Sequence, residues 1–456
     1  MEKEGKKAGR WVLVLYPFQG HINPMLQLAT ILHSKGFSII IVHPEFNSPN
    51  PSNHPEFTFR PIPDKLSESN VSLGDFANLV LTLNKHCLAP FQQCMNQILH
   101  EKDSTDHVAG IIYDTLSYFA QSVADDLRLP GISVRTSAAA TMLVFAVFPN
   151  PDKEGYTSFP DSISENQTLE VDLQILQLQQ LLASILRNPT DAMSKLRTEV
   201  IHATKSSSAI IVNTMDFLEE AVLSKIKEYF PSPIFPVGPF HKLAATRSSS
   251  LLKEETNCLS WLDKQALKSV LYVSFGSMAT IDEQELIETA WGLANSELPF
   301  LWVIRPGLVR GSEWIELLPK DFLDRVGERG CIVKWAPQRK VLAHSAVGGF
   351  WSHCGWNSTL ESISEGVPML CRPFVGDQLL DSKYICHVWK VGLELENNNL
   401  ERGKIEEAIK RLMLDVEGEN VRKNAMNLKE KTELSLTEGG SSSNYLNDLV
   451  KHISSN

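Results

Sequence analysis

The segment HCGWNSTLE, residues 353–361, gathers polar and ring-bearing side chains between two apolar stretches of the chain. It follows GGFWSH, residues 348–353, which predicts a strand, and it leads into a helical pattern. Ligands of parallel α/β sheets bind where strands end, and the free amides at a helix N-terminus attract phosphate oxygens. The segment therefore predicts a binding site for a phosphorylated ligand.

Individual side chains in this segment suit a phosphate and a sugar. His353 has a ring N–H for a phosphate oxygen, and Gly355 lets the backbone approach a ligand closely. Asn357 and Ser358 add short donors at the predicted helix start, and Glu361, one turn further, could accept from ribose hydroxyls. A simpler interpretation also fits, in which Asn357 or Ser358 only caps the helix and His353 is a structural strand-end residue.

A histidine and an aspartate stand at predicted strand ends in the first half of the chain. His21 follows the first strand directly, with Gly20 before it, and Asp114 ends the strand VAGIIYD. An imidazole titrates near neutral pH and suits removal of a proton from an alcohol, while a carboxylate on its second nitrogen would stabilise the imidazolium. The residues alone leave open whether this is a catalytic pair or two unrelated strand-end side chains.

These residues need a scaffold, and the first half of the sequence has the pattern of alternating strands and helices. WVLVLYP (11–17) predicts a strand, FQGHINP (18–24) a loop, and MLQLATILHSKG (25–36) a helix with apolar residues every three or four positions. Further strands are predicted at 37–43, 108–114, 131–136 and 208–214. Such alternation indicates an α/β domain whose parallel sheet is covered by helices on both faces.

A second α/β series follows a break in the pattern. The serine run and mixed charge of residues 239–256 predict a linker between an N-terminal domain, 1–238, and a C-terminal domain, 257–440. Strands are predicted at 269–277, 300–306, 331–337, 348–353 and 368–373, with helices that include 281–296 and 357–366. Residues 441–456 predict a final helix, which we expect to pack back on the N-terminal domain.

Composition narrows the classes of function. The chain has 456 residues, 43% of them hydrophobic and 21% charged, which fits a globular protein of two domains. The net charge of -11 argues against general binding to nucleic acid or to anionic membranes. The seven cysteines are scattered, and the longest apolar run, 138–148, is too short to span a bilayer. We expect a cytoplasmic protein with no membrane anchor.

Several common motifs are missing from the sequence. No two glycines are spaced G-x-G, so the dinucleotide turn of nicotinamide oxidoreductases is absent, and there is no Walker loop. The sequence also lacks H-E-x-x-H and any D-x-D pair that could hold a divalent metal against a diphosphate. We therefore expect a site without a metal.

A longer pattern surrounds the opening segment. Residues 335–378, WAPQRKVLAHSAVGGFWSHCGWNSTLESISEGVPMLCRPFVGDQ, resemble the plant secondary product glycosyltransferase box, the signature of plant UDP-sugar-dependent glycosyltransferases. FQGHINP near the start, YVSFGS before the box and GGSS near the end extend the resemblance over nearly the whole chain. EFNSPNPSNHPEFTF and SYFAQSVAD resemble the subgroup that glucosylates small hydroxy acids, phenolics, cytokinins and terpenoids.

The resemblance implies the GT-B fold, two Rossmann-like domains that face each other across a cleft, and it implies roles for the donor-side residues. In this family's pattern Trp335 would stack on uracil with Gln338 beside it, and Glu361 would bind ribose. The resemblance also implies that the diphosphate is bound by His353, Gly355, Asn357, Ser358 and Ser277. Trp356 would pack near phosphate and sugar, and Asp377 and Gln378 would bind the sugar hydroxyls. A terminal glutamine in the box usually accompanies glucose.

By the same resemblance, His21 would be the general base and Asp114 its partner. The expected reaction moves glucose from UDP-glucose to a hydroxyl or carboxyl oxygen, or a nitrogen, of a small plant metabolite, with inversion to a β-glucoside. UDP-glucose would be a co-substrate, with no cofactor and no metal, and the protein would be a monomer. The rival interpretation is a catalytically silent protein that binds a UDP-sugar, for which the box alone would suffice.

One region departs from the family's pattern. Relatives often carry a proline-rich loop where this chain has the leucine-rich and helical LEVDLQILQLQQLLASILRN, residues 169–188. This region commonly lines the acceptor site, so the acceptor stays open, and Tyr156 and Phe159 are the nearby aromatic residues. Five other prominent residues are expected to be structural, namely His344, His387, Trp291, Trp302 and Trp351.

Overall fold

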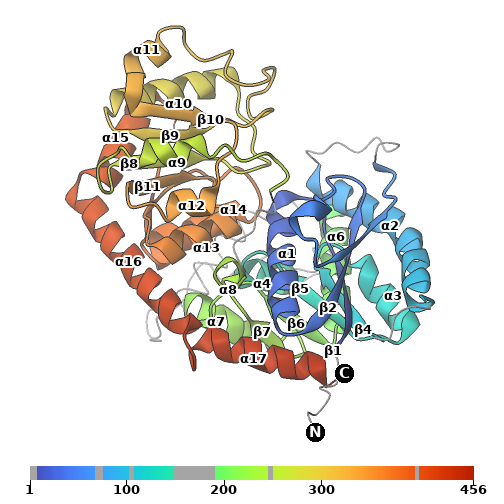
Figure 1. The fold of residues 1–456 in the computed structure, drawn as a ribbon. Helices are drawn as coiled ribbons and strands as arrows, with labels where there is room; N and C mark the ends of the chain where they lie inside the picture. Colours follow the sequence, from blue (N-terminus) through green and yellow to red (C-terminus); the bar gives the residue numbers. More distant parts are fainter. Residues whose placement is uncertain are drawn as a thin grey trace. The chain divides into compact units, whose positions relative to one another are not determined.

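The computed structural model describes residues 8–66, 75–101, 107–147, 190–244, 250–395 and 400–455 (Figure 1). The chain divides into two compact units. The first comprises Met1–Leu251 with Glu438–Asn456, and the second comprises Leu252–Thr437. The division falls inside the predicted linker, 239–256, but this stretch is not all linker: it contains a short helix, and Phe240 within that helix is fully buried.

The first unit is built on a seven-stranded parallel sheet with the order β3-β2-β1-β4-β5-β6-β7. Its strands are β1 (Ala8–Val14), β2 (Phe37–Pro44), β3 (Thr58–Ile62), β4 (Val108–Asp114), β5 (Gly131–Arg135), β6 (Ala209–Val212) and β7 (Ile234–Pro236). Its helices are α1 (Gln19–Ser34), η1 (Pro51–Asn53), α2 (Phe76–Leu99), α3 (Phe119–Leu127), α4 (Ala139–Val147), α6 (Asp191–Ser206), α7 (Asp216–Ile226), α8 (Phe240–Leu243) and α17 (Ser441–Ser454).

The second unit repeats the plan with a six-stranded parallel sheet in the order β10-β9-β8-β11-β12-β13. Its strands are β8 (Val270–Ser274), β9 (Phe300–Val303), β10 (Gly330–Val333), β11 (Val347–Ser352), β12 (Met369–Cys371) and β13 (Gly392–Glu394). Its helices are α9 (Asn257–Leu262), α10 (Glu283–Asn295), α11 (Phe322–Val326), η3 (Gly327–Arg329), α12 (Gln338–Leu342), α13 (Trp356–Glu365), α14 (Gln378–Lys383), η4 (Tyr384–Val388), α15 (Arg402–Met413) and α16 (Val416–Leu436).

The first sheet is buried on both faces because its strands are nearly continuous apolar runs. Successive side chains of β1 point to opposite faces. Trp11 and Leu13 join a core that contains residues of α1 and α17, whereas Val12 and Val14 join a core that contains residues of α2 and α3. Polar side chains are therefore left to the loops at the strand ends.

Predicted strands in the second unit were too long at their C-terminal ends. The strand predicted at 269–277 ends at Ser274, and the strand predicted at 331–337 ends at Val333. The residues beyond these points lie outside the strands. The sequence analysis also missed β3, β7 and β13, which are short strands at sheet edges, where few apolar residues are needed.

The loop predicted at 18–24 is wrong in most of its length, because α1 starts at Gln19 and includes Pro24. Proline has no amide hydrogen and usually ends a helical pattern. In α1 it removes one hydrogen bond, the one that would reach the carbonyl of Gly20, and the rest of the helix continues to Ser34. His21 consequently lies in the first turn of a helix.

The five residues expected to be structural lie as expected for packing or surface positions. Trp302 and Trp351 are fully buried in the core of the second unit, and Trp291 packs against the same core. Nε2 of His344 lies 3.2 Å from a carboxylate oxygen of Asp263, and the His387 side chain is 57% exposed.

The leucine-rich segment 169–188, Tyr156 and Phe159 lie outside the described residues. Among the residues described, no helix has both the length and the apolar character to cross a membrane.

Helix α17 is part of the first unit although it follows the whole second unit in sequence. Leu449 and Ile453 are buried in the core shared with α1, and the Ser441 hydroxyl donates to Asp216 at 2.7 Å. The last helix therefore contributes apolar surface to a core formed mainly by residues before 251.

Changing Leu449 to Ala should lower the free energy of unfolding of the first unit by about 2–5 kcal/mol, because a buried leucine leaves a cavity. Changing Asn447, which is exposed on the same helix, to Ala should change it by less than about 0.5 kcal/mol. Urea unfolding followed by fluorescence measures both. Equal midpoints for the two variants would contradict the docking of α17.

Candidate active site

Both sheets reverse their strand order at a central pair of strands, and the residues selected from the sequence lie there. In the first unit the chain runs from β1 outward to β2 and β3, then returns to β4 on the other side of β1. In the second unit the same reversal separates β8 from β11. At such a switch point the loops after the two strands diverge and leave room for a ligand at the carboxyl edge.

At the first switch point His21 and Asp114 meet. Nδ1 of His21, in the first turn of α1, lies 2.8 Å from Oδ2 of Asp114 at the end of β4. The aspartate side chain is 1% exposed and the histidine side chain is 24% exposed. The structure therefore brings together the two residues that were predicted as a pair, with the histidine on the accessible side.

A third residue, Thr136, which the sequence analysis did not select, completes this arrangement. Its Oγ1 lies 3.0 Å from Nδ1 of His21 and donates to Oδ2 of Asp114 at 3.2 Å. The other oxygen, Oδ1 of Asp114, accepts the amide of Leu116 at 2.9 Å, so the carboxylate is fixed in orientation. A carboxylate accepts only, so it selects the tautomer with the proton on Nδ1 and leaves Nε2 of His21 as a base.

Tyr16 forms the apolar wall beside this histidine. Its ring packs edge-on against the His21 ring with centroids 5.0 Å apart, and its hydroxyl is buried without a hydrogen-bond partner in the described structure. Burial, with a further contribution from the charge of Asp114, raises the pKa of Tyr16 well above its usual value. Tyr16 therefore stays protonated and does not compete with His21 as a base.

At the second switch point His353 follows β11 and lies between two glycines. A Cβ on Gly276 would approach Nε2 of His353 to 2.4 Å, and a Cβ on Gly355 would approach it to 2.5 Å. Nδ1 of His353 is buried without a partner in the described structure. Burial, followed by the positive charge of Arg305, lowers the pKa of His353 to about 4. The ring is therefore neutral near pH 7 and has one N–H to donate.

The start of α13 is not capped by a side chain. Gly355 is the N-cap residue, with φ -63° and ψ 143°, and no side chain there accepts a helix amide. The N-cap position is therefore occupied by Gly355 and not by Asn357 or Ser358. Both residues lie inside the first turn, where their amides and those of neighbouring residues can face an anion.

Gln338 links three residues beside this helix. Its Nε2 donates to Oγ of Ser358 at 2.9 Å and to Oε2 of Glu361 at 2.8 Å, and its Oε1 accepts the hydroxyl of Tyr272 at 3.2 Å. Burial raises the pKa of Glu361, against the opposing effect of this hydrogen bond. The loop that precedes Gln338 carries Trp335, whose ring is partly exposed and whose carbonyl accepts the amide of Glu255 at 2.8 Å.

The remaining predicted donor residues lie at the same edge of the second sheet. Ser277 follows β8 and is partly exposed, and Asp377 is the N-cap residue of α14 after β12. Oε1 of Gln378 accepts the amides of Phe374 at 2.9 Å and Val375 at 3.2 Å, so the side chain closes its own loop and keeps its amide N–H groups for other partners. Trp356 is buried, with its ring centroid 6.2 Å from that of Trp389.

A family model described as UDP-glucoronosyl and UDP-glucosyl transferase matches residues 25–432, most of the chain. The protein belongs to this family. Its relatives include UDP-glycosyltransferase 76B1 of Arabidopsis thaliana, 47% identical over 97% of this chain and 98% of the relative, and UDP-glycosyltransferase 76H1 of Stevia rebaudiana, 45% identical over 94% and 100%. Flavonol 3-O-glucosyltransferase UGT76E12 of Arabidopsis thaliana is 43% identical over 99% of this chain and 98% of its own length.

Solved structures of plant glycosyltransferases have the same fold. UGT2 of Phytolacca americana, complexed with UDP-2fluoro-glucose and pterostilbene, superposes with a TM-score of 0.81 at 26% identity and covers 98% of this chain and 99% of its own. Os79 of O. sativa in complex with UDP gives a TM-score of 0.80 at 26% identity, over 97% and 100%. The predicted plant UDP-glycosyltransferase family and GT-B fold class are confirmed, and the protein is an enzyme of this family.

Sequence reasoning missed several residues of this glycosyltransferase's two switch points: Tyr16, Thr136, Tyr272 and Arg305. Thr136 could have been found, because it ends the predicted strand 131–136, the direct neighbour of the strand that ends at Asp114. Arg305 stands at the end of a predicted strand too, but its direction and burial carry no signal in the sequence. Tyr272 lies within β8, where an aromatic residue is indistinguishable from core.

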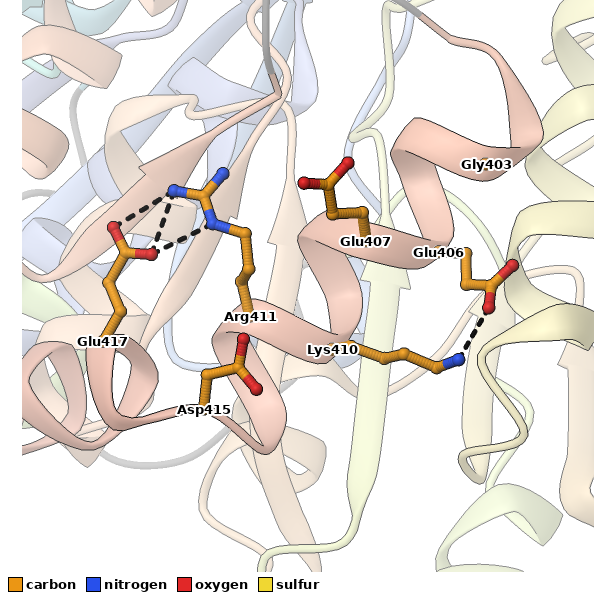
Figure 2. Close-up of a pocket in the computed structure, with 7 residues that line it drawn as sticks. All are labelled: Gly403, Glu406, Glu407, Lys410, Arg411, Asp415 and Glu417. Atoms are coloured by element: carbon orange, nitrogen blue, oxygen red, sulfur yellow. Dashed lines mark hydrogen bonds and ion pairs between the residues drawn. The ribbon is translucent and has the colours of Figure 1, made fainter.

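A surface hollow of about 700 Å³ lies elsewhere in the second unit, on α15 and the turn to α16 (Figure 2). Its two cations are already paired: Nζ of Lys410 lies 2.6 Å from Oε1 of Glu406, and Arg411 binds Glu417 through two nitrogens at 3.0 and 3.1 Å (Figure 2). It contains none of the predicted site residues. In the described ranges, no three His, Cys, Asp or Glu side chains are close enough together to hold a metal ion.

The lowered pKa of His353 has a measurable effect on stability. Between about 4 and the ordinary value of 6.5, the unfolded chain binds a proton at this position and the folded protein does not. The contribution of His353 to the free energy of unfolding therefore falls as the pH falls through this window.

Changing His353 to Gln should remove this dependence. The stability difference between the parent and the variant should shift in favour of the variant as the pH falls from 7 toward about 4.5. Urea unfolding of both proteins at several pH values measures the shift. A difference that does not change with pH would contradict the lowered pKa of His353.

Proposed function

We propose that the enzyme transfers glucose from UDP-glucose to a hydroxyl or carboxyl oxygen, or a nitrogen, of a small plant metabolite, with inversion to a β-glucoside and without a metal. The observation that carries this proposal is the hydrogen-bonded arrangement of His21, Asp114 and Thr136 at the first switch point. A protein that only bound a UDP-sugar would not need an oriented imidazole in its other unit.

His21 acts as the general base. Its Nε2 accepts the proton of the acceptor while Nδ1–H donates to Asp114 at 2.8 Å, so the imidazolium forms next to a negative charge. The acceptor oxygen forms its bond to C1 of glucose as the bond from C1 to the diphosphate oxygen breaks on the opposite face. The electron pair of the broken bond leaves with UDP, and the configuration at C1 inverts.

UDP leaves with developing negative charge, which the second unit stabilises with dipoles. His353 donates as a neutral imidazole, and Ser277, Asn357, Ser358 and the amides at the start of α13 supply further donors. Gly355 allows the diphosphate to approach the backbone, and Trp356 packs near phosphate and sugar. Preorganised donors in a partly buried site take the place that a divalent metal has in other nucleotide-sugar enzymes.

Recognition of the rest of the donor follows the family's pattern. Trp335 stacks on uracil, and Glu361 accepts from ribose hydroxyls with its orientation set by Gln338 at 2.8 Å. Asp377 and Gln378 bind the sugar hydroxyls. The amide N–H groups of Gln378 are suited to this role because its carbonyl oxygen is already held by the 374–378 loop.

The acceptor is a small hydroxylated molecule of the classes named for the resembling subgroup: hydroxy acids, phenolics, cytokinins or terpenoids. The name of one relative refers to a flavonol, and the solved structures of two similar enzymes contain pterostilbene and a trichothecene. We further propose that the enzyme is a cytoplasmic monomer that needs no cofactor beyond its co-substrate UDP-glucose. The rival interpretation, a catalytically silent UDP-sugar-binding protein, would use the donor-side residues alone and would leave the hydrogen-bonded His21 and Asp114 without a role.

The first assay contains the parent protein, UDP-glucose, a chelator and a panel of these acceptors. The protein should add one hexose to at least one acceptor class, as detected by mass spectrometry. Changing His21 to Ala should reduce transfer by about 10²–10⁴-fold, because proton removal by a positioned base contributes that much. UDP affinity, measured by calorimetry, should remain.

The matched control is His202→Ala, which removes an exposed histidine of the same unit and should leave transfer unchanged. Binding of UDP by the parent with no transfer to any acceptor would favour the silent binder. Transfer by His21→Ala at the parent rate would show that another group is the base.

Changing Gly355 to Ala tests the donor side. The backbone angles of Gly355 suit any residue, but its new Cβ would lie 2.5 Å from Nε2 of His353 and displace that ring. We expect UDP affinity to fall by about tenfold or more, because the displaced ring loses one well-oriented hydrogen bond to the ligand. Gly403→Ala is the control, because a Cβ there meets no atom within 4 Å. Equal UDP affinity of the two variants would contradict the donor site.

A further inference from the structure

Arg305 is a buried cation at the second switch point that the proposed mechanism does not yet use. It follows β9, its residue is 8% exposed, and it forms no ion pair with any carboxylate of the described residues. Its guanidinium instead donates to three main-chain oxygens: Nε to Gly276 at 3.1 Å, Nη1 to Pro306 at 3.1 Å, and Nη2 to Ala279. Each of its three nitrogens therefore donates a hydrogen bond, but no carboxylate of the described residues neutralises its charge.

A nearby arginine has the opposite arrangement. Arg372 is also buried, and it binds Oε1 of Glu285 through Nη2 at 2.8 Å. Burying a guanidinium without a counter-ion costs free energy, and a protein normally supplies a carboxylate or replaces the cation by a neutral donor. Arg305 therefore has the environment of a cation whose counter-ion is a ligand.

The hydrogen bonds of Arg305 also set the direction of the turn that carries Ser277. The carbonyl of Gly276 points toward Nε of Arg305. In a planar trans peptide the N–H lies opposite the C=O, so the amide of Ser277 points away from the guanidinium. In the described structure that amide donates to no protein acceptor. The turn thus presents an unused N–H on the side opposite the buried charge.

His353 belongs to the same assembly. Arg305 binds the carbonyl of Gly276, and the His353 ring packs against that glycine. A Cβ added to Gly276 would lie 2.4 Å from Nε2 of His353. The charge of Arg305 also acts on this ring and helps to lower its pKa. One cation therefore contacts the Ser277 turn directly and adds to the effect of burial that lowers the pKa of the neighbouring imidazole.

We propose that Arg305 is a positioning residue for the diphosphate of the donor: it holds the 276–279 turn with the Ser277 amide toward the ligand and places an unneutralised positive charge behind that turn. This inference rests on the proposed donor function and deepens it. Arg305 acts through the turn and through space, without contact with the ligand. Together with the neutral donors it supplies the positive potential that a metal-free site requires for two phosphate groups.

The test compares UDP with uridine, which lacks the phosphates, for the parent and two variants by calorimetry. Arg305→Gln keeps two amide donors without the charge, and Arg305→Lys keeps the charge without the planar fork. UDP affinity should fall by about tenfold or more in Arg305→Gln, with uridine affinity within about twofold, and Arg305→Lys should retain more of the UDP affinity than Arg305→Gln. Arg310→Gln, an exposed arginine of the same loop, should change neither affinity.

A second readout is the ¹³C-labelled His353 ring signal followed against pH. Its titration should move upward from about 4 in Arg305→Gln, because a neighbouring positive charge is removed. If Arg305 only held the turn by hydrogen bonds, this shift of the His353 titration would not be required. Arg305→Gln would then bind UDP more tightly than Arg305→Lys. If Arg305→Gln does not fold, the comparison of UDP with uridine is made with Arg305→Lys alone. The expected result is then a partial loss of UDP affinity in Arg305→Lys.

The outcomes separate this inference from the proposed function. A parent protein that binds UDP no more tightly than uridine would overturn the diphosphate site itself. Tight UDP binding by the parent, with an equal affinity in Arg305→Gln, would overturn only the role of Arg305. Parallel losses of UDP and uridine, or a larger UDP loss in Arg305→Lys than in Arg305→Gln, would overturn it as well.

Discussion

Parallel strands that are buried on both faces offer a ligand only their ends, and this constraint governs where chemistry can occur in the protein. Trp11 to Val14 of β1 alternate between two apolar cores, so the centre of that sheet is apolar on both faces. Polar side chains gather instead where β1 and β4, or β8 and β11, end on the two sides of a reversal in strand order. Every candidate residue at either switch point owes its position to this topology.

The two switch points use burial in different ways. At the first, burial fixes Asp114 and Thr136 so that they orient one face of His21, whose other face remains accessible. At the second, burial favours neutral forms: it lowers the pKa of His353 to about 4 and raises that of Glu361. An imidazole that stays neutral is a donor whose strength does not vary near pH 7. The first arrangement suits proton transfer, and the second suits the recognition of an anion by dipoles.

Much of the fold and of the site was predictable because it rests on local patterns. Continuous β-branched runs such as Phe37–Pro44 identify buried parallel strands, and the segment from 353 to 361 carries its donors close together in sequence. The errors have physical causes. The predicted loop 18–24 is helical from Gln19, because Pro24, near the start of α1, removes only one hydrogen bond. The edge strand β13 has three residues and too few apolar positions to produce a pattern.

Short-range periodicity and motif spacing were enough to predict the two α/β series, the family, and the residue types available for binding UDP and for proton transfer. Which of these residues meet follows from the order of the strands in each folded sheet. His21, Asp114 and Thr136 come from three separate segments and are joined by the order of β1, β4 and β5 in the sheet. Arg305 likewise reaches the Ser277 turn because β8 and β9 are neighbours. Contacts of this kind depend on strand order and side-chain direction, which local sequence does not encode.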